Sequence, residues 1–100
     1  MAEIRELKEG DKLTVSISGR LDTNTSSDIE SKILGMLNGV SSLLIDLSEL
    51  EYISSAGLRT LLTIQKVFAS QGEMKLVNIK EKIMDIFEIT GFTAVLNIIK

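Results

Sequence analysis

Two adjacent serines occupy the part of this sequence that offers the sharpest chemical possibilities. Ser54 and Ser55 follow an apolar stretch at residues 43–47 and a short polar connection, and they precede a run with helical periodicity. They therefore lie at the expected start of a helix, where unpaired backbone N–H groups and the positive end of the helix dipole favour an anion. One serine is expected to cap this helix, which leaves the other free for a second role.

The composition of the 100-residue chain excludes several kinds of chemistry. The chain contains no cysteine and no histidine. A disulfide framework, a Cys/His zinc site and a histidine general base are therefore impossible within it. The sequence Ile53-Ser54-Ser55-Ala56-Gly57 also lacks the first glycine of a serine hydrolase nucleophile elbow. A serine hydrolase is consequently a poorly supported interpretation.

Charge and hydropathy limit the partners that we expect. The formal net charge of −3 gives no electrostatic footprint for nucleic acid. The apolar stretches are short and interrupted, and the charged N-terminus lacks a signal-peptide apolar region, so we expect no membrane insertion and a cytoplasmic location. No repeat or linker divides the chain, which predicts one domain over residues 1–100.

The first half of the sequence predicts a hairpin, a helix and a central strand. Residues 4–8 and 12–18 are separated by a glycine-containing turn, and the alternation within residues 12–18 is typical of a half-buried strand. Cap candidates at residues 23–26 and a stop at Asn38-Gly39 delimit a helix. Residues 43–47 are almost continuously apolar, which predicts a strand covered on both faces.

The second half predicts a helix from the serine pair to Gln71-Gly72, a strand at residues 74–77 and a helix at residues 80–88. The tail at residues 94–99 fits either a last strand or a short helix. The order β-β-α-β-α-β-α, followed by this tail, predicts an α/β domain with a mixed β-sheet and helices packed on it. The opening hairpin should be antiparallel, and the later crossovers favour parallel strands.

This order of elements, together with two motifs, resembles the STAS domain family. The motifs are Gly19-Arg20-Leu21-Asp22 and the run from Asp46-Leu47-Ser48 to Tyr52-Ile53-Ser54-Ser55-Ala56-Gly57-Leu58. STAS domains occur in sulfate transporters and in bacterial anti-sigma factor antagonists. The similarity covers essentially the whole chain, and its short length resembles the stand-alone bacterial antagonists.

The resemblance implies a binding protein that is not an enzyme and needs no cofactor. Such an antagonist binds an anti-sigma factor that is also a serine kinase, which releases the sigma factor and so regulates transcription. The kinase then phosphorylates a serine at the start of the second helix and thereby ends the binding. A phosphatase restores the unphosphorylated form.

The resemblance also assigns roles to individual residues. The family's usual motif is Asp-Ser-Ser/Thr-Gly-Leu, in which the first serine accepts the phosphate. Ser54 stands at the aspartate position, and Ser55 stands at the acceptor position. Arg59 follows one helical turn later and could pair with a phosphate on Ser55. The residues predicted to form the partner surface are Asp22, Ser54, Ser55, Ala56, Gly57 and Arg59.

The residues themselves leave other interpretations open. Asp22 could simply cap a helix, Arg59 could be an ordinary exposed charge, and Gly57 could answer a local packing requirement. Asp46 is expected to be a strand-end residue bonded to the following turn rather than a catalytic carboxylate. The alternative function is a constitutive STAS accessory subunit of a transporter or signalling complex, in which Ser55 would serve only as a cap.

Overall fold

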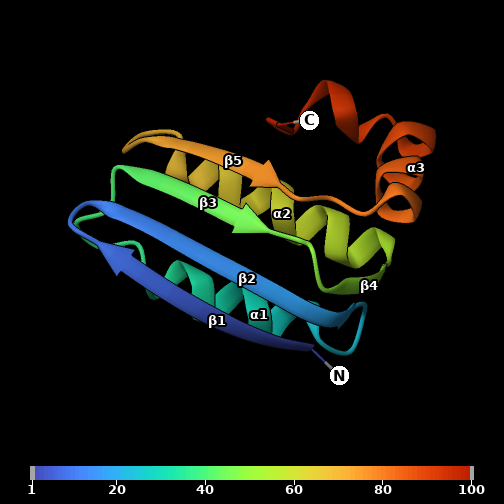
Figure 1. Ribbon diagram of the computed structural model, residues 1–100, viewed down its shortest axis with the longest axis horizontal. Coiled ribbons are helices and arrows are strands. Elements are labelled where there is room, and N and C mark those ends of the chain that lie inside the picture. The colour runs from blue at the N-terminus through green and yellow to red at the C-terminus, as the bar shows by residue number, and fades with distance from the viewer. Residues whose placement is uncertain (1, 100) are drawn as a thin grey trace.

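The chain folds into a mixed β-sheet with helices packed on it, as the sequence predicts. The computed structural model describes residues 2–99 (Figure 1). The strands are β1 (Ala2–Glu9), β2 (Lys12–Leu21), β3 (Ser42–Asp46), β4 (Leu50–Ile53) and β5 (Glu73–Val77). The helices are α1 (Ser26–Leu34), α2 (Ser55–Phe68), α3 (Glu81–Thr90) and the short 3₁₀ helix η1 (Phe92–Ala94).

The sheet combines one antiparallel hairpin with parallel pairings. β1 and β2 pair antiparallel around a turn in which Gly10 has a φ of 65°, a left-handed value that suits glycine. β2 pairs in parallel with β3, and β3 pairs in parallel with β5, which gives the order β1-β2-β3-β5. The predicted hairpin and the predicted parallel crossovers are both confirmed.

The helices α1 and α2 cover the same face of the sheet (Figure 1). Buried Leu13, Val15 and Ile17 alternate along β2 with half-buried polar residues on the other face. The expectation that residues 43–47 are covered on both faces is wrong. Because both crossover helices lie on one side, Leu43 and Ile45 are fully buried, whereas Leu44 is only half-buried on the open face.

Three further boundaries differ from the sequence prediction. A short strand, β4, lies between β3 and α2 and pairs in parallel with the end of β2. Helix α1 ends at Leu34 instead of continuing to Asn38-Gly39. The tail is neither a full strand nor only a helix, because η1 is followed by a single parallel bridge between Leu76 and Ile98.

Candidate functional site

The serine pair lies at the start of α2, where the two side chains have different roles. Ser54 is the N-cap residue, with extended backbone angles, and its Oγ accepts a hydrogen bond from the Gly57 N–H at 3.4 Å. Ser55 is the first helical residue, and it is exposed. One serine therefore caps the helix, as expected, and the hydroxyl of the other faces solvent.

Leu21, at the end of β2, holds this helix start in place. The Ser54 N–H donates to the Leu21 carbonyl oxygen at 2.9 Å. A Cβ added to Gly57 would lie 2.5 Å from the same oxygen and 2.8 Å from the Ile53 side chain. Gly57 is therefore required for close approach of α2 to β2. This is the local packing requirement considered above, at a residue that is also predicted to lie at the partner surface.

Asp22 organises the turn that leads from β2 into α1. Its Oδ1 accepts hydrogen bonds from the backbone N–H groups of Asn24 at 3.0 Å and Thr25 at 3.2 Å. The Thr25 hydroxyl donates to the Arg20 carbonyl oxygen at 2.7 Å and accepts from the Asp22 N–H at 3.0 Å. The N-cap position of α1 belongs to Thr25, so Asp22 stabilises the preceding turn and is not the helix cap itself.

The pKa of Asp22 is lowered by this environment. Desolvation of the carboxyl group acts in the opposite direction and raises the pKa. The hydrogen bonds from Asn24 and Thr25 and the charge of Arg20 together outweigh it, since all of them stabilise the carboxylate. Asp22 is therefore an ionised group at neutral pH, beside the start of α2.

Arg20 and Tyr52 form a contact that the sequence interpretation did not single out. The two residues face each other in the register of β2 and β4, and the guanidinium carbon lies 4.2 Å from the centre of the tyrosine ring. The Arg20 Nε also lies 3.6 Å from Asp22 Oδ2. No signal of this contact was present in the sequence, because the contact depends on β4, a strand that the sequence did not reveal.

A shallow hollow of about 300 Å³ lies where α1 packs against α2. Ala56 and Arg59 of α2 line it, together with residues of α1 that include Ser26 and Glu30. The buried Thr60 hydroxyl lies 3.1 Å from the Glu30 carboxylate, which connects the two helices. Arg59 is exposed and has no ion pair among residues 2–99, so its guanidinium is open to a ligand or partner.

Asp46 has the structural role that was expected of it. Its Oδ1 accepts a hydrogen bond from the Ser48 N–H at 2.9 Å, in the turn that follows β3. Its Oδ2 lies 3.3 Å from the Asn78 amide nitrogen, which donates from the end of β5. These bonds connect two neighbouring strand ends and leave Asp46 outside the serine site.

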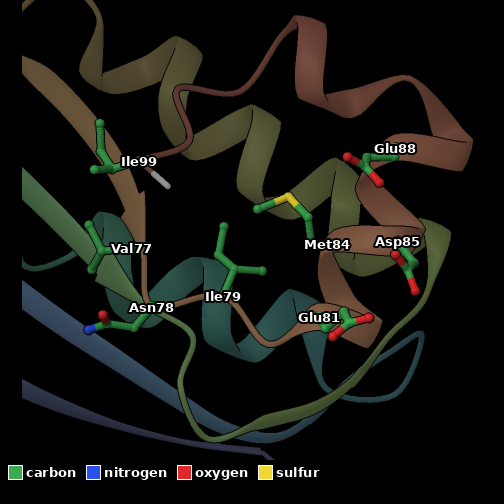
Figure 2. A pocket seen from close by; sticks show the side chains of 8 residues that line it. All are labelled: Val77, Asn78, Ile79, Glu81, Met84, Asp85, Glu88 and Ile99. Carbon is green, nitrogen blue, oxygen red and sulfur yellow. The ribbon is translucent and has the colours of Figure 1, made fainter.

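A larger cavity, of about 660 Å³, lies elsewhere, between the end of β5, α3 and the C-terminal tail. Glu81, Asp85 and Glu88 of α3 line it together with apolar Ile79 and Ile99, and Figure 2 shows Ile99 across the opening from α3. No lysine or arginine lines this cavity among the described residues. Three carboxylates without a cation disfavour an anion, so this cavity is a poor site for a phosphate group.

Two further classes of site receive no support from residues 2–99. No group of three or more His, Cys, Asp or Glu residues in this range is placed to hold a metal ion. Within the same range, no helix has the length and apolar character needed to cross a lipid bilayer. The site at the start of α2 therefore has the clearest chemical character, which is an exposed hydroxyl at a helix N-terminus.

Comparison with known proteins identifies the family. The STAS domain model matches residues 3–100, so the chain belongs to the STAS domain family. It is 32% identical over 85 residues to BtrV of Bordetella bronchiseptica, provisionally named an anti-sigma factor antagonist, covering 83% of this chain and 73% of that protein. It is also 28% identical over 87 residues to the anti-sigma-B factor antagonist of Bacillus subtilis, covering 86% of this chain and 80% of that protein.

Solved structures show the same fold. The unphosphorylated form of the anti-sigma factor antagonist SpoIIAA superposes with a TM-score of 0.79 at 17% identity, covering 98% of this chain and 89% of that one. The phosphorylated form of Bacillus SpoIIAA gives a TM-score of 0.72 at 17% identity, with coverage of 98% and 92%. At this identity the likeness establishes the fold, and the roles of Asp22, Ser55 and Arg59 stay predictions.

Proposed function

We propose that this chain is an anti-sigma factor antagonist controlled by phosphorylation of Ser55. In its unphosphorylated form it binds an anti-sigma factor that is also a serine kinase, and the released sigma factor then directs transcription. The kinase phosphorylates Ser55 and ends the binding, and a phosphatase reverses this step. The observation that carries the proposal is an exposed Ser55 at the start of α2 in a STAS domain whose relatives are named as such antagonists.

The local geometry supports a phosphorylation site because Ser55 is dispensable for the helix cap. Ser54 already accepts the hydrogen bond from Gly57, so modification of Ser55 removes no cap. A phosphate would bring about −1.5 to −2 charges to a helix N-terminus, where the helix dipole and free N–H groups stabilise it. The fold should therefore tolerate the modification, and its disruptive effect falls on the bound partner.

The serine at position 54 is compatible with this switch, although the family usually has aspartate there. Its hydroxyl performs the capping function that an aspartate carboxylate could perform. It carries no charge, so a phosphate on Ser55 would meet no like charge from the preceding residue. The substitution thus preserves the helix start and removes one source of repulsion.

Arg59 gives the switch a second component. It lies one helical turn beyond Ser55 on α2 and has no ion pair among residues 2–99. Before phosphorylation its guanidinium can bind an acidic group of the partner, and afterwards it can pair with the new phosphate. Moving a complex from almost fully bound to almost fully free needs about 5.5 kcal/mol, so both repulsion and loss of this contact would contribute.

Binding and phosphorylation can be measured with an anti-sigma factor kinase identified by a pull-down with the chain. With ATP, the kinase should add one phosphoryl group, located at Ser55 by fragmentation of the protein in a mass spectrometer. Ser55→Ala should bind without being phosphorylated, and Ser55→Asp should bind more weakly. Ser70→Asp is the matched control, because Ser70 is exposed just beyond the other end of α2.

Two results would contradict the proposal. Equal affinities of Ser55→Ala and Ser55→Asp would exclude a switch based on charge at this position. Tight binding without phosphorylation, using a kinase shown to be active, would instead favour the constitutive STAS accessory subunit. In that case Ser55 would be only a residue of the first helical turn.

A further inference from the structure

The outer edge of β1 is open along its whole length. Among residues 2–99, Ala2–Glu9 form ladder pairs with β2 alone, and Figure 1 shows β1 at the border of the sheet. Leu7 lies toward the C-terminal end of this edge with 59% of its surface exposed. An open strand edge presents unpaired N–H and C=O groups that can pair with another strand.

The charged residues of this edge form no ion pair within residues 2–99. The ion pairs of residues 2–99 join Arg20 to Asp22, Lys32 to Asp28 and Lys75 to Glu73. None of them involves a residue of β1. Lys8 donates one hydrogen bond from its Nζ to the Asn38 carbonyl oxygen at 3.3 Å, which leaves two N–H donors of its ammonium group free. The charges of this strand can therefore still pair with an external partner.

The sequence of the edge complements itself in one antiparallel register. Two copies related by a two-fold axis normal to the sheet must pair about a central residue, because directly opposite residues share a face. With Leu7 at the centre, it faces Leu7 of the second copy. Glu6 then faces Lys8 of the second copy, and Arg5 faces Glu9 of the second copy. Every charged residue from 5 to 9 thus meets an opposite charge.

The neighbouring symmetric registers are less favourable. Centring on Arg5, Glu6 or Lys8 would place two identical charges directly opposite each other, which is destabilising. Centring on Ile4 avoids that repulsion, but it forms only one kind of ion pair. It also no longer places Leu7 opposite Leu7 of the second copy. The charge pattern therefore selects the register centred on Leu7.

We propose that two copies of this chain associate through β1 in that register, which joins their sheets into one continuous sheet. A contact made by two short strands is smaller than the interfaces of most stable complexes, so the dimer should be reversible and depend on concentration. Asp22, Ser55 and Arg59 all lie outside β1. The association is therefore independent of the proposed switch.

Cysteine cross-linking can test the register directly, since the chain contains no cysteine of its own. Leu7→Cys would place two thiols opposite each other with Cα atoms about 4.5–5.5 Å apart, which is within disulfide range. Mild oxidation with copper–phenanthroline should therefore give a covalent dimer. Arg5→Cys is the matched control, because its two copies would lie about 13 Å apart along the strands and should not cross-link.

A mixture of Arg5→Cys and Glu9→Cys should again give a covalent dimer, because these positions face each other in the proposed register. Cross-linking of Arg5→Cys alone to the same extent as Leu7→Cys would overturn the register. Absence of a Leu7→Cys dimer at millimolar protein concentration would overturn the association itself. Circular dichroism of each variant would verify that the fold is retained.

Charge reversal provides an independent test of the same pairing. Glu6→Lys alone, or Lys8→Glu alone, creates two like-charge contacts per dimer and should weaken association about tenfold in sedimentation equilibrium. The double variant Glu6→Lys/Lys8→Glu restores opposite charges and should recover the dissociation constant of the unmodified chain. Failure of the double variant to recover it would contradict direct pairing between positions 6 and 8.

Discussion

Helices α1 and α2 both begin at the carboxyl end of a strand, but their first turns are built differently. At the start of α1, Asp22 and Thr25 form several short hydrogen bonds, and the Arg20 guanidinium forms an ion pair with Asp22. At the start of α2, Ser54 makes one long cap bond of 3.4 Å, and Ser55 is exposed. The first turn of α1 also carries an acidic residue, Asp28, whereas the first turn of α2 carries none.

The turn before α1 is therefore structural, whereas the first turn of α2 has polar groups that are free to bind a ligand or partner. The polar groups around Asp22 are largely occupied by one another, so that turn holds a fixed carboxylate. The start of α2 retains its dipole and a free hydroxyl without a negative charge, so it can accept a phosphate. Leu21 connects the two, because it precedes Asp22 and accepts a hydrogen bond from Ser54.

The largest effect is expected when that connection is disturbed. Gly57→Ala would place a methyl group 2.5 Å from the Leu21 carbonyl oxygen, which forces the backbone of α2 or β2 to move. We expect a loss of about 1–3 kcal/mol in the free energy of unfolding, measured by urea denaturation. Gly35→Ala is the control, because its added Cβ would approach nothing closer than 3.4 Å and should change stability little.

If Gly57→Ala were as stable as the unmodified chain, α2 would not depend on close contact with Leu21. The two helix starts would then be free to move independently. Such a result would remove the structural reason for treating Asp22 and Ser55 as parts of one surface.

The sequence predicted most of the fold because the periodicity of apolar residues is strong within the longer strands and helices of this chain. The alternation in β2 and the helical spacing in α2 reflect burial on one face, which a sequence records directly. The strand β4 was missed because it has four residues, of which Glu51 and Tyr52 are exposed, and its partner lies at Gly19–Leu21. Pairing with such a distant segment leaves no local pattern.

The candidate site was predictable to a similar degree. The serine pair was found because N-cap residues have a strong local preference, and the assignment of the cap to Ser54 required the backbone angles. The contact between Arg20 and Tyr52 could not be inferred, since it follows from the register of β2 with β4. Local chemistry was thus readable in the sequence, whereas contacts between separate strands were not.

The second prediction compares the two turns through their hydroxyl groups. Thr25→Val removes a hydroxyl that makes bonds of 2.7 and 3.0 Å, and it should lower the free energy of unfolding by about 1–2 kcal/mol. Ser54→Ala removes one bond of 3.4 Å and should cost about 0.5 kcal/mol, at the low end for a cap. Urea denaturation of both variants would measure the difference, and a larger loss at Ser54 would reverse the comparison.

A smaller effect should follow when a negative charge is added to α2. Ser55→Asp places a carboxylate in a first turn that has no acidic residue, and it should stabilise the fold by about 0.3–1 kcal/mol at low salt. Ser70→Asp should change stability with the opposite sign, because Ser70 lies just beyond the last turn, at the negative end of the helix dipole. Thermal unfolding at low and high salt would test this, since salt screens both effects. A destabilising Ser55→Asp would contradict the tolerance of an anion at this position.

The smallest effect is expected from protonation of Asp22 at the start of α1. Its pKa lies below the ordinary value of about 3.9, because the hydrogen bonds from Asn24 and Thr25 and the charge of Arg20 outweigh desolvation. Since the folded state lowers the pKa, the stability contributed by the carboxylate is fully present above about pH 4 and is lost as pH falls through the folded value. Asp22→Asn should remove this acid dependence. It should leave the pH dependence of the free energy of unfolding near neutral pH unchanged. A carbon-13 NMR titration of the Asp22 carboxyl group would measure the midpoint, and a midpoint above the ordinary value would show that this turn does not hold a stabilised carboxylate.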